Sequence, residues 1–272
     1  MGNILITASH FRTLCQKAIH LLESNGHQVI LNDHELPYYS FEELAVWAPE
    51  IDGAIIGMDQ WNEQVFHIAP KLKILARFGV GVDNIDLEAA KRHGIQVVNA
   101  AGMNANAVAE LAVAMILNCL RGIPELNRKL TDGQWSRAVG RDLLGKTVGL
   151  LGFGDIGGRV AKKLSGFEVR LLAYDPYPNR EKAAALGVTL TDLDTVLTQS
   201  DILSIHMPSI PATRHVMNRE TFAKMKPDSY FINTARGALV DTQALVDAVA
   251  GGHLAGAAVD VYEQEPLPMG AP

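Results

Sequence analysis

The chain has 272 residues, of which 48% are hydrophobic, and its formal net charge is −6. This length is enough for about two domains with large cores. No run of lysine or arginine occurs, so the sequence gives no sign of binding to nucleic acid or to a membrane surface. The two cysteines, Cys15 and Cys119, lie in apolar helical patterns, which argues against a disulfide framework or a thiolate metal site. The N-terminus lacks the cationic region of a signal peptide, and we expect a cytoplasmic protein that holds no metal.

Short β-prone segments alternate with helical patterns through the first hundred residues. Strands are expected at 4–7, 28–31, 53–56, 74–77 and 96–98. Such alternation predicts a parallel sheet with helices on both faces. Residues 1–100 are therefore expected to form one doubly wound α/β domain.

The next predicted element is a helix at 104–120, with a second helix at 125–130. The first is apolar on nearly every face, and a helix of this kind is expected to be buried all round. Glu110 and Asn118 interrupt it, so it is not predicted to span a membrane. Two interpretations stay open, because the helix could pack inside the chain or form a homodimer interface.

The alternation of strands and helices begins again at Thr147. Further strands are expected at 147–151, 169–174, 188–190, 202–205, 230–233 and 257–259, which predicts a second doubly wound sheet. Ligands of such sheets bind beyond the carboxyl ends of the strands. The first domain could then supply the other wall of a binding cleft.

A glycine-rich turn follows the first strand of this second half. Gly152, Gly154 and Gly157 have G-x-G-x-x-G spacing, which lets the backbone approach a pyrophosphate at a helix N-terminus. Asp175 ends the next strand, eighteen residues after Gly157, where an acid can bond a ribose 2′-hydroxyl. The same carboxylate would repel a 2′-phosphate, so NAD is predicted rather than NADP. Arg180 is the nearby residue that could favour NADP, although a solvated loop arginine is the simpler interpretation.

Two later strands also end in residues that suit catalysis. Arg236 follows the strand at 230–233 and offers a planar fork of donors for a carboxylate. Asp260 ends the last strand, at the nicotinamide side of the expected cofactor. Glu265 stands before Pro266, in an extended conformation, and could partner an imidazole that serves as acid and base. Glu263, between these two acids, is interpreted as a solvated loop residue.

Taken together, these motifs resemble the D-isomer-specific 2-hydroxyacid dehydrogenases, and within them the phosphoglycerate dehydrogenase branch. The resemblance rests on segments 77–86, 152–157, 206–208, 233–237 and 260–266, with Asn99, Ala109 and Glu110. It implies a flavodoxin-like substrate domain at 1–100 and a Rossmann NAD-binding domain at 101–272. It also implies a substrate site at Arg77, Gly79, Val80 and Gly81, with Arg236 and Glu265 as catalytic residues. The implied cofactor residues are Gly152, Gly154, Asp155, Ile156, Gly157, Asp175, His206, Thr213, Ala235 and Asp260.

One departure from the family concerns the catalytic histidine, which in the family follows the Glu-Pro pair. The sequence ends seven residues after Glu265, and the segment that returns to the first domain is not in it. His206 suits a cofactor position and His253 a helix-end turn. The remaining histidines are interpreted as surface or loop residues: His10, His20, His27, His34, His67, His93 and His215. The sequence is expected to be part of a longer protein; the alternative is a natural short form without catalytic power.

A second departure concerns the substrate. Ile55 to Met58 stands where phosphoglycerate enzymes often carry an arginine, although Arg77 and Arg137 could supply charge. The predicted function is transfer of a hydride between a D-2-hydroxy acid, with 3-phosphoglycerate as one candidate, and NAD. The alternative is an NAD-sensing module that resembles corepressors and has no turnover. The predicted partners are the small acid and a second copy of the chain, bound through the cofactor domain.

Overall fold

The computed structural model describes residues 1–32, 38–137, 139–265, 267 and 270. The chain divides into two compact units, Met1–Asn104 and Ala105–Pro272, which are called unit 1 and unit 2 below. The division falls at residue 104, where the sequence suggested 100.

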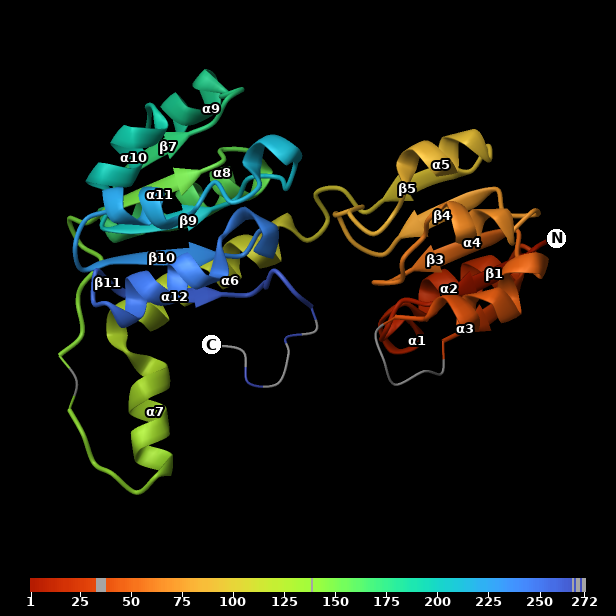
Figure 1. Ribbon diagram of the computed structural model, residues 1–272, viewed down its shortest axis with the longest axis horizontal. Coiled ribbons are helices and arrows are strands. Elements are labelled where there is room, and N and C mark those ends of the chain that lie inside the picture. Colours follow the sequence, from red (N-terminus) through yellow and green to blue (C-terminus); the bar gives the residue numbers. More distant parts are fainter. Residues whose placement is uncertain (33–37, 138, 266, 268–269, 271–272) are drawn as a thin grey trace. The chain divides into compact units, whose positions relative to one another are not determined.

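Unit 1 is one parallel sheet with helices on both faces (Figure 1). The strand order is β2-β1-β3-β4-β5, which is the flavodoxin-like order. Its strands are β1 (Asn3–Ile6), β2 (Gln28–Leu31), β3 (Gly53–Ile56), β4 (Ile74–Arg77) and β5 (Gln96–Asn99). Its helices are α1 (Phe11–Leu14), α2 (Gln16–Ser24), α3 (Phe41–Trp47), η1 (Ala48–Glu50), α4 (Glu63–His67) and α5 (Leu87–Arg92).

The core of unit 1 has two layers because successive side chains of a strand point to opposite faces. Ile4 and Ile6 of β1 pack with Phe11 and Ile19 of the first two helices. Leu5, between them, joins the layer formed with α3, α4 and α5.

Unit 2 is a second parallel sheet, with strand order β11-β10-β9-β6-β7-β8. This is the Rossmann order, with the switch point between β6 and β9. Its strands are β6 (Thr147–Leu151), β7 (Arg170–Tyr174), β8 (Val188–Leu190), β9 (Ile202–Ile205), β10 (Ser229–Asn233) and β11 (Leu254–Val259). Its helices are α6 (Ala105–Arg121), α7 (Ile123–Thr131), α8 (Asp155–Leu164), η2 (Ser165–Phe167), α9 (Arg180–Ala185), α10 (Leu193–Gln199), η3 (Pro211–Thr213), α11 (Arg219–Lys224), η4 (Gly237–Leu239) and α12 (Thr242–Ala250). The predicted α/β class with two doubly wound sheets is confirmed.

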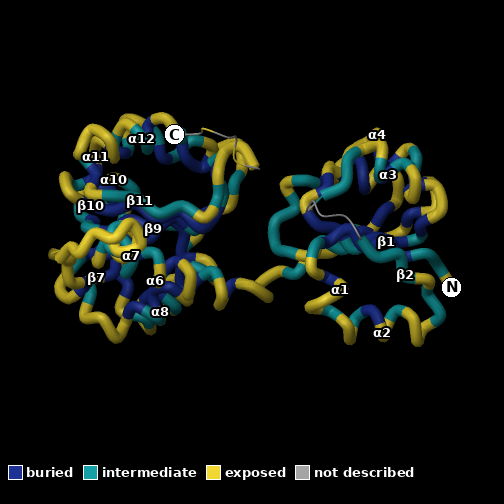
Figure 2. Tube along the Cα trace, turned by 90° about the horizontal axis from the view of Figure 1, so that it is seen from below, coloured by how far each residue is buried: buried dark blue, intermediate teal, exposed yellow. Residues whose placement is uncertain are grey.

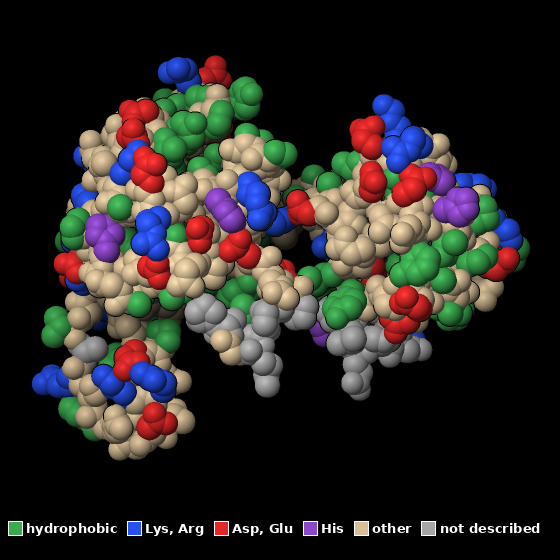
Figure 3. Space-filling model, in the orientation of Figure 1, with side chains coloured by type: hydrophobic (Ala, Val, Ile, Leu, Met, Phe, Trp, Pro, Cys, Tyr) green, Lys and Arg blue, Asp and Glu red, His purple; other side chains and the backbone are tan. Residues whose placement is uncertain are grey.

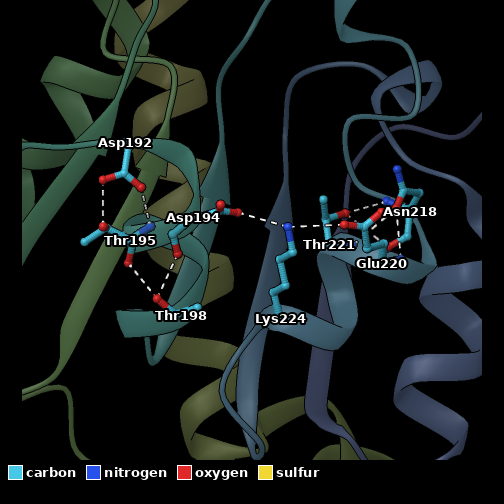
Figure 4. A network of polar contacts seen from close by, with 8 residues as sticks. All are labelled: Asp192, Asp194, Thr195, Thr198, Asn218, Glu220, Thr221 and Lys224. Atoms are coloured by element: carbon cyan, nitrogen blue, oxygen red, sulfur yellow. Dashed lines mark hydrogen bonds and ion pairs between the residues drawn. The ribbon is translucent and has the colours of Figure 1, made fainter.

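The central strands of unit 2 are fully buried, as Figure 2 shows for β9 and β10. Helices α6, α8 and α9 contribute to the hydrophobic layer on one face, and α10, α11 and α12 to the layer on the other. Asp192 and Asn218 cap α10 and α11 by accepting backbone N–H groups. Lys224 of α11 joins the two helices by an ion pair with Asp194 of α10, and it also pairs with Glu220 of its own helix (Figure 4).

Helix α6 differs from its prediction, because it is not buried all round. It buries one stripe, formed by Ala105, Ala109, Ala112, Ile116 and Leu120, and Leu111 on another side is 37% exposed. The buried stripe packs in the core with α8 and β10, and Val113, Met115, Leu117 and Cys119 pack partly against the same core. Leu111 is the large apolar side chain of α6 that stays exposed.

Helix α7 leaves α6 at Gly122 with a bend of 64° and stands away from the sheet of its unit (Figure 1). None of its residues is buried. Within the described residues, no single helix has the length and hydrophobicity needed to cross a membrane, although the bent pair of α6 and α7 together passes that test.

Candidate active site

The glycine turn after β6 has the geometry that its sequence predicts. Gly152 has φ of +96°, and a Cβ there would lie 2.8 Å from the backbone of His206. A Cβ on Gly157 would lie 2.2 Å from the carbonyl oxygen of Gly152. At Gly154 a Cβ would meet nothing within 4 Å. The outer glycines therefore permit close packing, while the middle one leaves open space above the backbone.

That open space lies at the N-terminus of α8, where Gly154 is the cap residue and no side chain caps the helix. The carboxylate of Asp155 pairs with Arg159, one turn further on, at 3.0 Å. Ile156 packs its side chain against the core of the unit. The first-turn amides thus remain for a bound phosphate, and this turn fits a dinucleotide.

Asp175 lies beside the same turn. Its carboxylate accepts hydrogen bonds from the amides of Phe153, at 2.7 Å, and Tyr177, at 2.8 Å. On the other side, Lys182 of α9 donates to the carbonyl of Gly154 at 2.7 Å and lies 5.4 Å from the centre of the Phe153 ring. The sequence analysis missed Lys182, since its contact depends on α9 packing beside α8 and no motif spacing reveals that.

His206 follows β9 and backs the glycine turn. Its Nε2 shares a hydrogen bond of 3.0 Å with the hydroxyl of Ser204. Its Nδ1 is enclosed and has no partner among the described residues, although the residue as a whole is only partly buried. This enclosure lowers the pKa of His206 to about 4. The ring is therefore neutral at pH 7.

Thr213 has its hydroxyl engaged within its own loop. The hydroxyl accepts from the amide of Ile210 at 2.9 Å and donates to the carbonyl of Pro208 at 2.7 Å. The side chain thus fixes the loop that follows His206.

The segment after β10 is a tight turn held by Asn233. The Asn233 side chain accepts from the amide of Ala235, at 2.9 Å, and donates to the carbonyl of Arg236, at 3.0 Å. The guanidinium of Arg236 donates to the carbonyl of Ala235 at 2.7 Å, and the residue is half-buried. These bonds hold Arg236 at the carboxyl end of β10, as the sequence predicts.

The segment after β11 carries the three acids. The amide of Asp260 donates to the carbonyl of Asn233 at 2.9 Å, which places the start of this segment beside the Asn233 turn. Burial and the charge of Glu265 raise the pKa of Asp260. Glu265 accepts from the amide of Tyr262 at 2.9 Å. Pro266, to which its expected extended conformation was tied, lies outside the described residues.

Glu263 is an exposed loop acid, as the sequence suggested, but its carboxylate has specific partners. It bonds His215 at 2.6 Å and accepts from the amide of Thr242 at 2.8 Å. His215 is accordingly more than a surface histidine, while His34 lies outside the described residues. His215 and Glu263 are 48 residues apart in the sequence, so no motif spacing predicts that they form a pair.

The substrate residues expected from the sequence belong to unit 1. Arg77 donates from its guanidinium to the carbonyl of Phe78 at 2.8 Å. The amide of Gly79 donates to the carbonyl of Arg77 at 2.8 Å, so it is already engaged. Asn99 donates to the carbonyl of Val80 at 2.6 Å and fixes the start of the loop that leads to Gly81. Among the described residues, no three His, Cys, Asp or Glu side chains are arranged to hold a metal ion.

Comparison with known proteins gives concordant matches. Residues 113–272 match the family model of the D-isomer specific 2-hydroxyacid dehydrogenase, NAD binding domain. A hydroxypyruvate reductase from Thermotoga maritima is 40% identical, over 90% of this chain and 81% of that protein. A D-3-phosphoglycerate dehydrogenase from Archaeoglobus fulgidus is also 40% identical, over 93% of this chain but only 48% of that protein, so the chain spans about half of its length.

A solved structure, that of the TT0316 protein from Thermus thermophilus, superimposes with a TM-score of 0.90 at 36% identity, covering 99% of this chain and 85% of that one. The glycine turn, Asp175 and the Arg236 segment all lie in the unit that the family model matches. The chain belongs to the D-isomer-specific 2-hydroxyacid dehydrogenases, and its cofactor is NAD.

Proposed function

We propose that the protein transfers a hydride between C2 of a D-2-hydroxy acid and NAD. The observation that carries the proposal is the pairing, in unit 2, of an open glycine turn beside Asp175 with an arginine held at the end of β10. The first feature suits a dinucleotide and the second suits a carboxylate. The reported relatives are named as enzymes, which favours turnover over the cofactor-sensing alternative.

In this proposal the binding roles in unit 2 are assigned from its own geometry. Unit 2 binds the cofactor, which supplies the hydride acceptor or donor. The amides at the start of α8 bind the pyrophosphate, and Asp175 binds the adenosine ribose. Arg236 holds the substrate carboxylate, which fixes the orientation of C2 for the transfer. The loop of Gly79, Val80 and Gly81 in unit 1 is proposed as a substrate-binding loop on the resemblance to the family, and the amide of Gly79 is engaged with the carbonyl of Arg77 in this structure.

Glu265 is proposed to assist the proton transfer at the 2-hydroxyl by supporting an imidazole. Within the described residues its carboxylate bonds the Tyr262 amide. The neighbouring imidazole, that of His215, bonds Glu263 instead. The proton-transfer role thus rests on the resemblance to the family, and the binding roles rest on geometry in unit 2.

The substrate itself is proposed only as a class. Relatives with equal identity to this chain are named for hydroxypyruvate and for phosphoglycerate. The segment after β3 has Gly57 and Met58, which offer no charge to a phosphate. Small unphosphorylated 2-hydroxy acids are therefore proposed as candidate substrates, in addition to 3-phosphoglycerate.

The test is NADH oxidation by the full-length protein with a panel of 2-oxo acids. The panel is hydroxypyruvate, glyoxylate, pyruvate and 3-phosphohydroxypyruvate, each with NADH and with NADPH. Turnover of at least one acid with NADH supports the proposal. Tight NAD binding without turnover of any acid would contradict the proposal and would support the alternative, an NAD-sensing module.

We also propose a homodimer formed through unit 2. Ile123, Leu126 and Leu130 form an apolar stripe on α7, which has no buried residue in the chain alone. A nine-residue helix is marginal by itself in water, so another surface must cover the stripe. The same unit has a recess of about 320 Å³ at the end of α6, whose lining includes apolar Leu117, Leu120, Leu144 and Phe167 and charged Arg121, Arg141, Asp142 and Glu168. The apolar stripe of α7 and a partly apolar recess on one unit suit a self-complementary contact between two copies. The cytoplasmic location stays a prediction.

A further inference from the structure

Three loop segments come together at the carboxyl edge of the unit 2 sheet. The first contains Thr213 and His215, the second runs from Arg236 to Thr242, and the third contains Glu263 and Glu265. They follow three different strands, β9, β10 and β11, so their contacts decide how the proposed site residues are held relative to one another.

The backbone contacts between these segments are close. The amide of His215 donates to the carbonyl of Ala238 at 3.0 Å. A Cβ added to Gly237 would lie only 2.0 Å from the carbonyl of Tyr262. The second segment therefore packs directly on the third, and only a glycine permits this approach.

Two side chains fasten the segments. His215 Nε2 lies 2.6 Å from Glu263 Oε1, and the amide of Thr242 donates to Glu263 Oε2 at 2.8 Å. Both side chains of the ion pair are about two-thirds buried, with 35% and 30% of their surface exposed. His215 has φ of +48°, a conformation that non-glycine residues rarely adopt and that surrounding contacts must maintain.

The charge of Glu263 is favoured in this arrangement. Burial opposes ionisation, but the hydrogen bonds from Thr242 and His215 outweigh it and lower the pKa of the carboxyl. A charged acceptor makes stronger hydrogen bonds than a neutral one. The group of His215, Glu263 and the Thr242 amide is called the 215–263 clasp below.

We propose that His215 and Glu263 are positioning residues, which hold Thr213, Arg236 and Glu265 in the arrangement that hydride transfer requires. This inference rests on the proposed function. Each of the three segments carries one proposed site residue, and the clasp contacts all three segments. Loss of Glu263 removes both bonds of the clasp, and loss of His215 removes the bond to the first segment while the Thr242 amide still bonds Glu263. The backbone contacts between the segments remain in both cases, so the fold persists while Arg236 and Glu265 lose their fixed placement.

The experiment compares Glu263→Ala, His215→Ala and the double variant with the unmodified protein. Hydrogen exchange of segments 236–242 and 260–265 is measured with and without NAD, and kcat and KM are measured with the best acid. Glu263→Gln, which can still accept from the Thr242 amide, serves as the conservative variant. Asp247→Ala is the control, because Asp247 pairs with Arg219 on the exposed side of α12, away from the clasp.

Each single variant is expected to speed exchange in both segments and to lower kcat on the order of 10- to 100-fold, with a smaller change in KM. The double variant should lose no more than the worse single variant, since the two residues act as one unit. Glu263→Gln should recover part of kcat, and Asp247→Ala should match the unmodified protein.

Two results would contradict the proposal that His215 and Glu263 act together to hold these segments. One is an unchanged rate of hydrogen exchange in both segments, and the other is a loss of kcat in the double variant equal to the product of the two single losses. A kcat equal to that of the unmodified protein despite faster exchange also overturns the positioning role of the clasp. Failure of the proposed function is distinct, because it would appear as absence of turnover in the unmodified protein, while the exchange data still report on the clasp.

Discussion

Asp175 has two contacts that its sequence position did not reveal, because its carboxylate already accepts from the amides of Phe153 and Tyr177. It therefore holds the glycine turn as well as facing the expected ribose. Asp175→Ala should weaken NAD binding by about 1.5 to 3 kcal/mol, the range for a lost hydrogen bond to a charged group. Calorimetry with NAD and NADP measures this change.

The matched variant is Asp175→Asn, which keeps an acceptor for the turn but loses the charge. It should retain part of the NAD affinity and reduce the discrimination against NADP, because the ammonium of Lys182 remains beside the turn. Equal affinity of the unmodified protein for both cofactors would rule out the role assigned to Asp175.

Arg236 illustrates how a side chain can be specified by its shape as well as by its charge. Arg236→Lys keeps the positive charge but loses the planar fork that binds a carboxylate through two hydrogen bonds. We expect turnover to fall strongly while the affinity for NAD stays nearly unchanged. Steady-state kinetics and a fluorescence titration with NADH measure the two effects, and full activity in this variant would refute the assignment.

The pKa of His206 predicts how the free energy of unfolding depends on pH. Its pKa is lowered by burial to about 4, whereas an unfolded histidine titrates near 6.5. Between these values the unfolded chain binds more protons than the folded one, so stability is lost as the pH falls from about 6.5 to 4. The full loss is about 3 kcal/mol, and none of it is present above pH 7.

Urea unfolding at several pH values measures this loss. His206→Asn should lessen the slope of the free energy of unfolding against pH over that range, whatever it does to the free energy at pH 7. A slope identical in the two proteins would show that His206 is not the group responsible.

At the scale of elements, the positions of the strands were predicted best, and the burial of the helices was predicted worst. The strands at 28–31, 53–56, 74–77 and 147–151 agree with the structure residue for residue. They are short apolar runs of four or five residues, a length that favours a strand over a helix. Strand β11 begins at Leu254, three residues before its predicted start, because pairing with β10 overrides the low strand propensity of its small residues.

The caps of the helices allow an element-scale test. Asn218 accepts from the amides of Glu220 and Thr221 at the start of α11, and Figure 4 shows it beside the ion pairs of Lys224. Asn218→Ala should destabilise the protein by about 1 kcal/mol, the usual value for a lost N-cap. Urea unfolding measures the change, and Asn218→Asp should restore most of the stability. An alanine variant as stable as the original would mean that the ion pairs alone fix the start of α11.

At the scale of the whole molecule, the sequence predicted the two sheets and the segments that form the site. The glycine turn, Asp175 and Arg236 lie at strand ends, where the alternation of elements fixes their positions. The contacts of Lys182 and Glu263 could not be predicted. They join residues 28 and 48 positions apart, so they depend on how helices and loops pack after the sheet has formed.

The uncovered surface of α6 and α7 gives the test at this scale. Figure 3 shows charged side chains of both signs on the outward face of α7, where Arg128 and Lys129 pair with Glu125. Apolar side chains of α7 and of the segment after it are also exposed. Leu130 is 66% exposed, and Trp135 is 80% exposed. Exposed apolar side chains gathered on one element often mark a protein–protein contact, and a second copy would bury them.

We therefore expect the purified protein to be a dimer by light scattering at micromolar concentration. Leu130→Glu combined with Trp135→Ser should shift it to a monomer, because a buried charge without a partner strongly opposes association. Leu21→Glu is the control, since Leu21 is a similarly exposed leucine on α2 of unit 1. Loss of the dimer in the control, or a dimer that survives in the double variant, would place the interface elsewhere. If the unmodified protein is a monomer at every concentration, the proposed homodimer is wrong.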